Sequence, residues 1–331
     1  EEYLAQSQVV HPTGFIHHET RCGSTLVTII LASNPKMLAY SEPKVLLDAS
    51  YNMCKECPWE FRVRLLRLAV GLMGVVSSSS SSSFSRGDDA ARRARPTHLF
   101  FKLGRPATAL ALELYKAAFP KTPYIWMHRE PVEVMRSLLI RPQKKFGDNR
   151  YNWQVLELLE QHQNATEEQL AAARDDAVPC LRPLPQVAQV LSLKEDSDYA
   201  TREKYCAVFL QITCKAALKA MAGDPWGLPV AYTKDLAQYF IEFILPEFFK
   251  VYLQPNELQQ AYAISGLYSK GHPQRGQKDD GFETDAIQKH KTAWHELINC
   301  ADQYVRPAYN DLVDMEKMKV DIMKKKKRLP A

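Results

Sequence analysis

Short apolar runs alternate along this chain with longer segments in which apolar residues recur at helical spacing. Four runs are each followed by such a segment. The runs cover residues 14–18, 97–103, 122–129 and 227–232, and the helical segments begin near Ser24, at 107, at 131 and after 232. Strands that alternate with helices are typical of βαβ units, which build parallel sheets. The pattern predicts an α/β fold of three layers, with a central parallel β-sheet flanked by helices.

Three segments depart from this alternation. Residues 77–96 are a Ser-rich stretch with Gly, Asp and Arg, and such a stretch cannot bury enough apolar surface to order itself. Strand signals resume directly after it, so it predicts a disordered insertion within a single domain of residues 1–331. Residues 141–225 are mainly helical in pattern and are expected to shape the side of the site that receives an acceptor. Residues 284–318 predict a pair of amphipathic helices interrupted at Pro307.

Composition narrows the class of protein. The chain has 331 residues, of which 46% are hydrophobic and 24% charged, and its net charge is +5. These values are typical of a soluble globular protein. Much of the positive charge lies in residues 324–328, which are best interpreted as a solvated tail, so no nucleic-acid partner is predicted. No apolar stretch approaches the roughly 18 residues that a membrane helix needs, although a removed leader or anchor stays open.

The seven cysteines are scattered along the chain. An odd, scattered set argues against a disulfide framework and for the cytoplasm or another reducing compartment. Cys54 and Cys57 have the spacing of a zinc-binding pair, but no second pair follows. We therefore expect two free thiols there and no metal site.

Residues 19–25, "ETRCGST", which we call the anion loop, lie between the first strand and the first helix. The first N–H groups of a helix have no partners within the helix, and the helix dipole is positive at that end, so such a terminus binds anions. Gly23 allows close approach of a ligand, Ser24 and Thr25 add hydroxyl donors, and Arg21 adds a charged fork of donors. The alternative is a plain strand–turn–helix with a capping Ser.

The anion loop is not the usual phosphate loop of nucleotide triphosphatases. That loop has the form GxxxxGK[ST], whereas this chain has His18 at the first Gly position and no Lys before the hydroxyl pair. A smaller anion than a nucleoside triphosphate with Mg²⁺ is therefore predicted.

A second strand–turn–helix carries residues that suit an anion. Arg129 ends the strand, Pro131 stands where the first turn of a helix accepts Pro, and Ser137 follows on that helix. Arg129 and Ser137 are placed to reach one anion beside the sheet edge. Taken alone, they are better explained as a surface Arg and a helix Ser that bind nothing.

As an ordered pair, "RCGST" and "REPVEVMRS" resemble the sulfotransferase superfamily, which takes a sulfuryl group from 3′-phosphoadenosine 5′-phosphosulfate and needs no metal. The resemblance implies that the first motif holds the 5′-phosphosulfate and that the second holds the 3′-phosphate. Weaker matches extend it to the strand "LPVAY" and to a late basic loop. The implied donor-binding residues are Arg21, Cys22, Gly23, Ser24, Thr25, Arg129, Ser137 and Tyr232, with Lys270, Arg275 and Lys278 as candidates in the basic loop.

The resemblance also implies catalytic roles. Arg21 stands where the family places the cation that faces the departing phosphate, and Lys102 is a candidate donor to the moving sulfuryl group. Gly104 occupies the position of the catalytic His of the cytosolic branch. The chain therefore resembles the branches that use a Glu, and Glu42 is the candidate base. The alternative for Glu42 is a Glu that opens a helix just before Pro43. His17, His18 and His128 are reserve candidates for the base.

The expected function is sulfuryl transfer to a hydroxyl or amine of an acceptor, which is a small molecule, a carbohydrate or a peptide. Two alternatives stay open. One is a catalytically silent nucleotide-binding protein of the same fold, and the other is a P-loop kinase. Whether the chain forms a homodimer also stays open.

Overall fold

The computed structural model describes residues 7–52, 56–76, 95–104, 111–139, 180, 185–191, 201–267 and 286–328. Within these residues the centre is a five-stranded sheet in the order β2-β3-β1-β4-β5, and every pair of neighbours is parallel. The strands are β1 (Pro12–His18), β2 (Met37–Ser41), β3 (His98–Lys102), β4 (Tyr124–His128) and β5 (Gly227–Ala231). The predicted parallel sheet is confirmed.

Consecutive strand residues point to opposite faces of the sheet, and both faces are apolar. Phe15, Phe101 and Trp126 lie in one hydrophobic cluster, whereas their neighbours Ile16 and Phe100 lie in the other. A strand that is buried on both faces reads as a continuous apolar run. This explains why the sequence shows unbroken runs in place of an alternating pattern.

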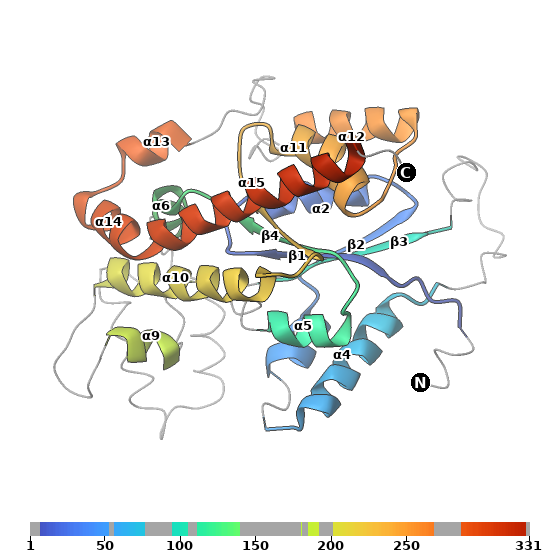
Figure 1. Cartoon of the computed structure of the whole chain (residues 1–331), viewed down its shortest axis with the longest axis horizontal. Coiled ribbons are helices and arrows are strands. Elements are labelled where there is room, and N and C mark those ends of the chain that lie inside the picture. Colours follow the sequence, from blue (N-terminus) through green and yellow to red (C-terminus); the bar gives the residue numbers. More distant parts are fainter. Residues whose placement is uncertain are drawn as a thin grey trace, which may run out of the picture.

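Helices cover the two faces of the sheet, which gives the three predicted layers (Figure 1). One face carries α2 (Ser24–Ala32), α11 (Leu236–Tyr239), the π-helix η5 (Phe240–Phe248) and α12 (Pro255–Leu267). The other carries α3 (Lys44–Leu47), the π-helix η1 (Asp48–Asn52), α4 (Trp59–Met73) and α5 (Leu112–Ala118). The long helices α10 (Arg202–Met221) and α15 (Arg306–Arg328) pack together, and α15 lies beside the edge strand β5.

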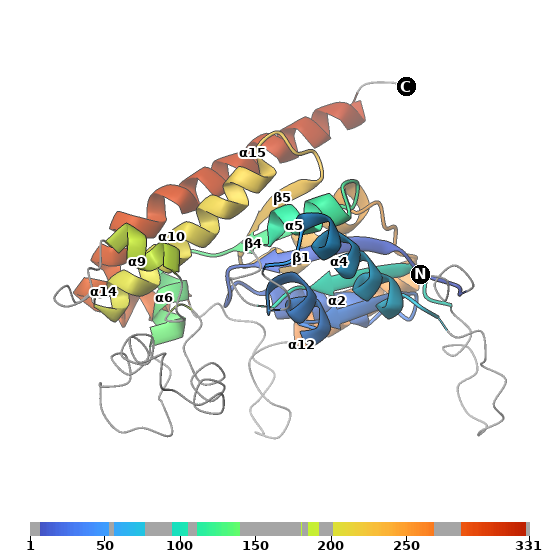
Figure 2. The same ribbon diagram turned by 90° about the horizontal axis from the view of Figure 1, so that it is seen from below.

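A third apolar cluster lies beside the carboxyl end of β4, away from the sheet itself (Figure 2). It joins α6 (Pro131–Leu139) and α10 to three smaller elements, which are α9 (Pro185–Leu191), α14 (His295–Cys300) and the π-helix η6 (Ala301–Val305). The short helix α13 (Ala286–Lys291) packs on α6. These helices support α6, which carries Ser137.

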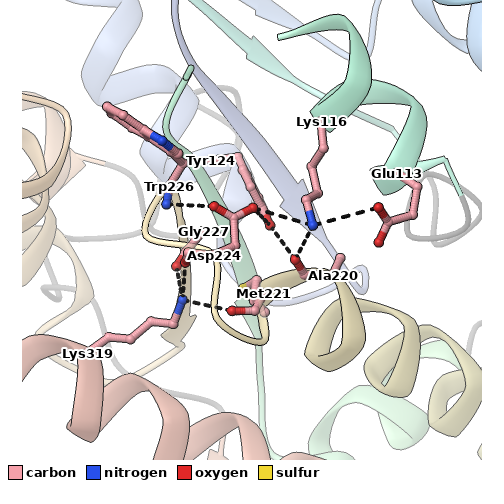
Figure 3. Close-up of polar contacts among 9 residues, drawn as sticks. All are labelled: Glu113, Lys116, Tyr124, Ala220, Met221, Asp224, Trp226, Gly227 and Lys319. Atoms are coloured by element: carbon pink, nitrogen blue, oxygen red, sulfur yellow. Dashed lines mark hydrogen bonds and ion pairs between the residues drawn. The ribbon is translucent and has the colours of Figure 1, made fainter. Parts of the chain in front are cut away.

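A cluster of polar contacts lies at the other end of the sheet, where strands β4 and β5 begin (Figure 3). The Lys319 ammonium donates to the carbonyl oxygens of Met221, Asp224 and Gly227 at 3.0, 2.6 and 2.8 Å. The Tyr124 hydroxyl donates to Asp224 Oδ2 at 3.1 Å. Because these contacts join α10, α15, β4 and β5 through backbone groups, we assign the cluster a structural role.

Two expectations about local structure are wrong. β2 was not among the predicted strands, although Met37 to Tyr40 form a short apolar run; in the structure only Met37 of its five residues is buried. The helix after residue 300 is not interrupted at Pro307. That proline is the second residue of α15, which follows the π-helix η6 without a break, and the helical run continues past it.

The expectation of free thiols is also wrong for part of the chain. Cys180 and Cys206 form a disulfide, with Cα atoms 4.8 Å apart, and Cys57 is disulfide-bonded as well. The fold brings Cys180 onto α10, which cysteine spacing cannot reveal. Cysteine usage therefore no longer argues for a reducing compartment. Cys22, Cys214 and Cys300 are free.

Residues 77–94 of the predicted Ser-rich insertion and most of segment 141–225 lie outside the described residues. In the part of the chain that is described, no helix combines the length and the apolar character needed to cross a membrane.

Candidate functional site

The predicted site residues that the structure describes gather at the carboxyl ends of the parallel strands. The anion loop follows β1, Glu42 follows β2, and Lys102 is the last residue of β3. Arg129 follows β4, and Tyr232 follows β5. Open α/β sheets bind ligands at this edge, where helix N-termini also lie.

The backbone of the anion loop is unusual. Thr20, Arg21 and Gly23 all have positive φ angles, of 91°, 54° and 80°. Left-handed φ values cost energy for residues other than glycine and concentrate at functional sites. At Gly23 the requirement is also steric, because a Cβ atom there would lie 2.5 Å from the ring of Tyr232. The last two residues of the anion loop, Ser24 and Thr25, form the start of α2.

Arg21 and Ser137 connect the two predicted anion motifs. The Nε atom of Arg21 donates to Ser137 Oγ at 2.8 Å. Ser137 lies on α6 and is 6% exposed. The Ser of the second motif therefore contacts the Arg of the first, and the two motifs form a single site.

Arg129 is buried and held on three sides. Its Nε atom donates to Glu133 Oε2 at 2.5 Å, and its Nη2 atom pairs with the same oxygen. Its Nη1 atom donates to the carbonyl oxygen of Arg21 at 3.3 Å. Its guanidinium lies over the Tyr232 ring, 4.2 Å from the centroid. The structure thus brings Arg129 next to the anion loop and to Tyr232.

Lys102 links the candidate base to the helix terminus. Its ammonium donates to Glu42 Oε1 at 2.5 Å and to Thr25 Oγ1 at 3.3 Å. The Lys102 side chain is 5% exposed, whereas the Glu42 side chain is 45% exposed. Glu42 therefore presents a carboxylate to solvent while a buried cation fixes one of its oxygens. Its backbone is held as well, by a bond from Glu42 N to Lys102 O at 2.7 Å, in a left-handed conformation with φ 52°.

Gly104 lies against Glu42. A Cβ atom at position 104 would lie 2.8 Å from Glu42 Cγ and 3.0 Å from Glu42 Oε2. Any side chain at position 104 would therefore compete with the Glu42 side chain for the same space. The resemblance to sulfotransferases implies that Gly104 stands where some members have a catalytic His. In the structure the Glu42 side chain occupies the space beside Gly104.

The three reserve histidines are buried and uncharged at neutral pH. Burial lowers the pKa of His17 to about 3 and that of His128 to about 3. Burial, followed by the nearby Lys102 charge, lowers the pKa of His18 to about 4. His18 Nε2 lies 3.7 Å from Glu42 Oε1, so it lines the site, while Glu42 is the more accessible group.

Two residues of the site were not singled out from the sequence. Glu133 pairs with Arg129, and its i,i+4 spacing on the first turns of α6 was the available signal. Glu19, in the anion loop, is 2% exposed, and its carboxylate accepts the N–H of Arg129 at 2.5 Å. Nothing in the local sequence indicates that Glu19 points inward.

Cys22, by contrast, was predicted to bind the donor. Its side chain is fully buried in the apolar cluster under α2, and burial raises the pKa of its thiol to about 12. Any contact of Cys22 with a ligand would therefore use its backbone N–H. Lys270, Arg275 and Lys278 lie outside the described residues.

One group among the described residues could offer three ligand atoms to a metal ion, namely Glu130, Glu133 and His290. Both carboxylates already pair with arginines, Glu133 with Arg129 and Glu130 with Arg306. These ion pairs account for the two acidic groups without a metal.

Taken together, the edge offers two arginines, a buried lysine, a helix N-terminus and one accessible carboxylate. The cations and the helix terminus can hold a multiply charged anion and stabilise charge that develops on it. The carboxylate can take a proton from a group that approaches from solvent. This set is suited to the transfer of an anionic group.

No protein-family model matches this chain, and no curated protein matches it. Among solved structures, it is similar to a sulfotransferase domain from the curacin biosynthetic pathway, with 14% identity over 89% of this chain and 98% of that chain and a TM-score of 0.38. A sulfotransferase domain from the Synechococcus PCC 7002 olefin synthase has 13% identity over 94% and 95%, with a TM-score of 0.38. Sulfotransferase STF9 from Mycobacterium avium has 12% identity over 95% and 79%, with a TM-score of 0.42. These likenesses concern the fold.

Proposed function

We propose that this protein is a sulfotransferase that moves a sulfuryl group from 3′-phosphoadenosine 5′-phosphosulfate to a hydroxyl or amine of an acceptor. The observation that carries the proposal is the pair of hydrogen bonds from the Lys102 ammonium to Glu42 and to Thr25. They place a candidate base and a buried cation at the N-terminus of α2. Arg21, in the same loop, adds a second cation.

The donor-binding residues suit a nucleotide with two phosphate groups. The anion loop and the α2 terminus would hold the 5′-phosphosulfate, with Arg21 as the charged partner. Arg129, held over Tyr232 and beside the carbonyl of Arg21, would hold the 3′-phosphate. The left-handed backbone at Thr20, Arg21 and Gly23 supports the proposal because the loop keeps a costly conformation beside these cations.

Glu42 is the proposed general base. It is the accessible carboxylate of the site, and Lys102 holds one of its oxygens. Gly104 leaves the space that Glu42 occupies, so the chain has room for a Glu base where a side chain at position 104 would displace it. In the reaction, Glu42 takes the proton of the acceptor hydroxyl or amine as that group attacks.

Arg21 and the N-terminus of α2 are the proposed stabilisers of the leaving group. The donor, when bound, supplies a sulfuryl group attached to a phosphate. As that bond breaks, negative charge grows on the phosphate. A guanidinium and oriented N–H groups act on such charge most strongly where water is excluded. Lys102, which reaches both Thr25 and Glu42, is placed to contact the transferred group.

The acceptor is proposed to be a small molecule, a carbohydrate or a peptide. The accessible Glu42 carboxylate supports an acceptor that approaches from solvent.

Two measurements test the proposal. Calorimetric titration should find that the protein binds adenosine 3′,5′-bisphosphate much more tightly than AMP or ATP. Incubation with sulfur-labelled donor and a panel of acceptors should yield labelled product. Preference for ATP would favour the kinase alternative, whereas bisphosphate binding without turnover on any acceptor would favour the silent nucleotide-binding protein.

A further inference from the structure

Glu19 is a buried acid at the centre of the site. It directly follows β1 and opens the anion loop, and it is 2% exposed. Its Oε1 atom accepts the backbone N–H of Arg129 at 2.5 Å, and its Oε2 atom accepts the Cys214 thiol at 3.4 Å. Burying an acidic group costs free energy, and these two hydrogen bonds offset part of that cost.

The hydrogen bonds of Glu19 connect the anion loop to the end of β4, where Arg129 lies. Its own N–H donates to Met127 O at 3.1 Å, which ties the start of the loop to β4. Its side chain then holds the N–H of Arg129, where β4 ends. The guanidinium of Arg129 in turn donates to the carbonyl of Arg21, two residues after Glu19. The position of Arg129 relative to Arg21 is therefore fixed through Glu19.

We propose that Glu19 is a positioning residue that sets the spacing between the anion loop and Arg129, and that it thereby determines the preference for a nucleotide with two separated phosphate groups. The inference rests on the proposed function, because it assigns Arg21 and Arg129 to different phosphates of one ligand. A ligand with a single phosphate engages one of the two arginines and is indifferent to their spacing. A 3′,5′-bisphosphate engages both and depends on it.

The surroundings of Glu19 add a pH signature. Burial raises the pKa of Glu19 to about 8, against the opposing effect of the Arg129 N–H. The other groups that act on it are the Cys214 thiol, the Glu130 carboxylate and the Arg129 guanidinium, and it acts in turn on Cys22 and Tyr309. Glu19 is therefore mostly protonated at neutral pH, and it gains a negative charge beside the anion site as the pH rises through about 8.

The test compares adenosine 3′,5′-bisphosphate with AMP by calorimetric titration on the full chain. Glu19→Ala removes the link, so its preference for the bisphosphate should fall about tenfold, the effect of one lost hydrogen bond. Glu19→Gln keeps an oxygen for the Arg129 N–H and should keep the preference at pH 7. Glu203→Ala is the matched control. Glu203 is a buried acid on α10 that pairs with Arg202 and accepts from Trp294, neither of which belongs to the anion motifs, and its loss should leave the preference unchanged.

The same variants are titrated between pH 7 and pH 9. Bisphosphate affinity of the wild-type chain should fall about tenfold as a charge appears beneath the site. The Glu19→Gln variant, which cannot ionise, should lose affinity much less. An equal loss in both proteins would overturn the assignment.

The outcomes separate this inference from the proposed function. If the wild-type chain does not prefer the bisphosphate, both fail. If it does and Glu19→Ala keeps the full preference, the positioning role alone is overturned. Should Glu19→Ala not fold, Glu19→Asp decides, because its carboxylate is one methylene short of the Arg129 N–H. A Glu19→Asp variant with unchanged preference would likewise overturn the role.

Discussion

The Nε atom of Arg21 donates a hydrogen bond of 2.8 Å to Oγ of Ser137, across 116 positions of sequence. Each residue belongs to a different strand–loop–helix unit, and the contact joins the two units at one edge of the sheet. Ser137, which the sequence assigned to a second anion beside Arg129, thus also orients the arginine of the first.

Arg129→Ala tests the second anion motif. If Arg129 holds the 3′-phosphate, the variant should bind adenosine 3′,5′-bisphosphate about 1.5–3 kcal/mol more weakly, the scale of a charged hydrogen bond. Binding of AMP should be nearly unchanged. Arg136→Ala is the control, since Arg136 is also a buried arginine of this region but donates to Thr292 O at 3.0 Å. Equal losses for both nucleotides would assign Arg129 to something other than the 3′-phosphate.

Glu42→Gln tests the base. The amide keeps the shape of the side chain and an oxygen for the Lys102 ammonium, so donor binding should be retained. Turnover should fall by about 10²–10⁴-fold, the range for losing general base catalysis. Glu113→Gln serves as control, because Glu113 is an exposed partner of Lys116 on α5. Near-normal turnover of Glu42→Gln in a steady-state assay would remove Glu42 from the mechanism and direct attention to His18.

The sequence predicted the parts of the fold that have strong local signals. β1, β3, β4 and β5 are buried on both faces, so their apolar runs stand out. β2 is an edge strand with partly exposed residues, and its short apolar run, Met37 to Tyr40, was not interpreted as a strand. The interruption expected at Pro307 is absent as well, because the π-helix η6 leads directly into α15 and the helical run continues past the proline.

The candidate site was predictable where short motifs lie at strand ends. Arg21 and Arg129 were identified in this way. Their contacts were not, because the bonds from Arg21 to Ser137 and from Arg129 to Glu19 connect residues more than a hundred positions apart. The disulfide of Cys180 and Cys206 was missed for a similar reason, since it depends on how segments pack and not on cysteine spacing.

Removal of metal ions tests the mechanism and the kinase alternative together. Turnover should survive EDTA, because the proposed chemistry uses Arg21, Lys102 and the α2 terminus to stabilise charge. The carboxylates of Glu130 and Glu133 are neutralised by Arg306 and Arg129, so chelation should not disturb them. Activity lost in EDTA and restored by Mg²⁺ would instead support phosphoryl transfer.

His17→Phe tests how the buried histidines shape acid stability. His17 is fully buried and packs edge-on against Tyr115 at a centroid distance of 5.4 Å. Burial lowers the pKa of His17 to about 3, below the value near 6.5 of an unfolded chain. At pH 5 the unfolded state therefore binds the proton and the folded state does not, so stability falls as the pH falls. Through this one residue, the free energy of unfolding should fall by about 2 kcal/mol between pH 7 and pH 5.

Urea unfolding at the two pH values measures the effect. The His17→Phe variant should lose about 2 kcal/mol less than the wild-type chain on acidification. His295→Phe, at an exposed position on α14, should keep the full wild-type loss. An acid loss that is identical in the His17→Phe variant and the wild type would mean that His17 is protonated within the fold.

Gly104→Ala tests whether the space beside Glu42 matters for turnover. The added Cβ atom would lie 2.8 Å from Glu42 Cγ and 2.9 Å from Glu42 Cβ, which is closer than such atoms approach, so Glu42 must move. Rotation of the Glu42 side chain can move Cγ but not Cβ, whose position the backbone fixes, so the left-handed backbone held to Lys102 O must shift as well. A displacement of about 1 Å at a reacting group can cost about a hundredfold in rate. The donor contacts of Arg21 and Arg129 are not touched.

The expected result for Gly104→Ala is therefore a selective defect, with bisphosphate affinity kept and turnover reduced about a hundredfold. Gly266→Ala is the matched control, because Gly266 lies in α12 and a Cβ atom there would have nothing within 4 Å. That change should leave turnover intact and stabilise the chain by about 0.5–1 kcal/mol, as for Gly to Ala in a helix. Combining Gly104→Ala with Glu42→Gln should add little to the loss from Glu42→Gln alone, since both act on one group. If the reductions in turnover of the two single variants multiply in the double variant, Gly104 acts through something other than Glu42.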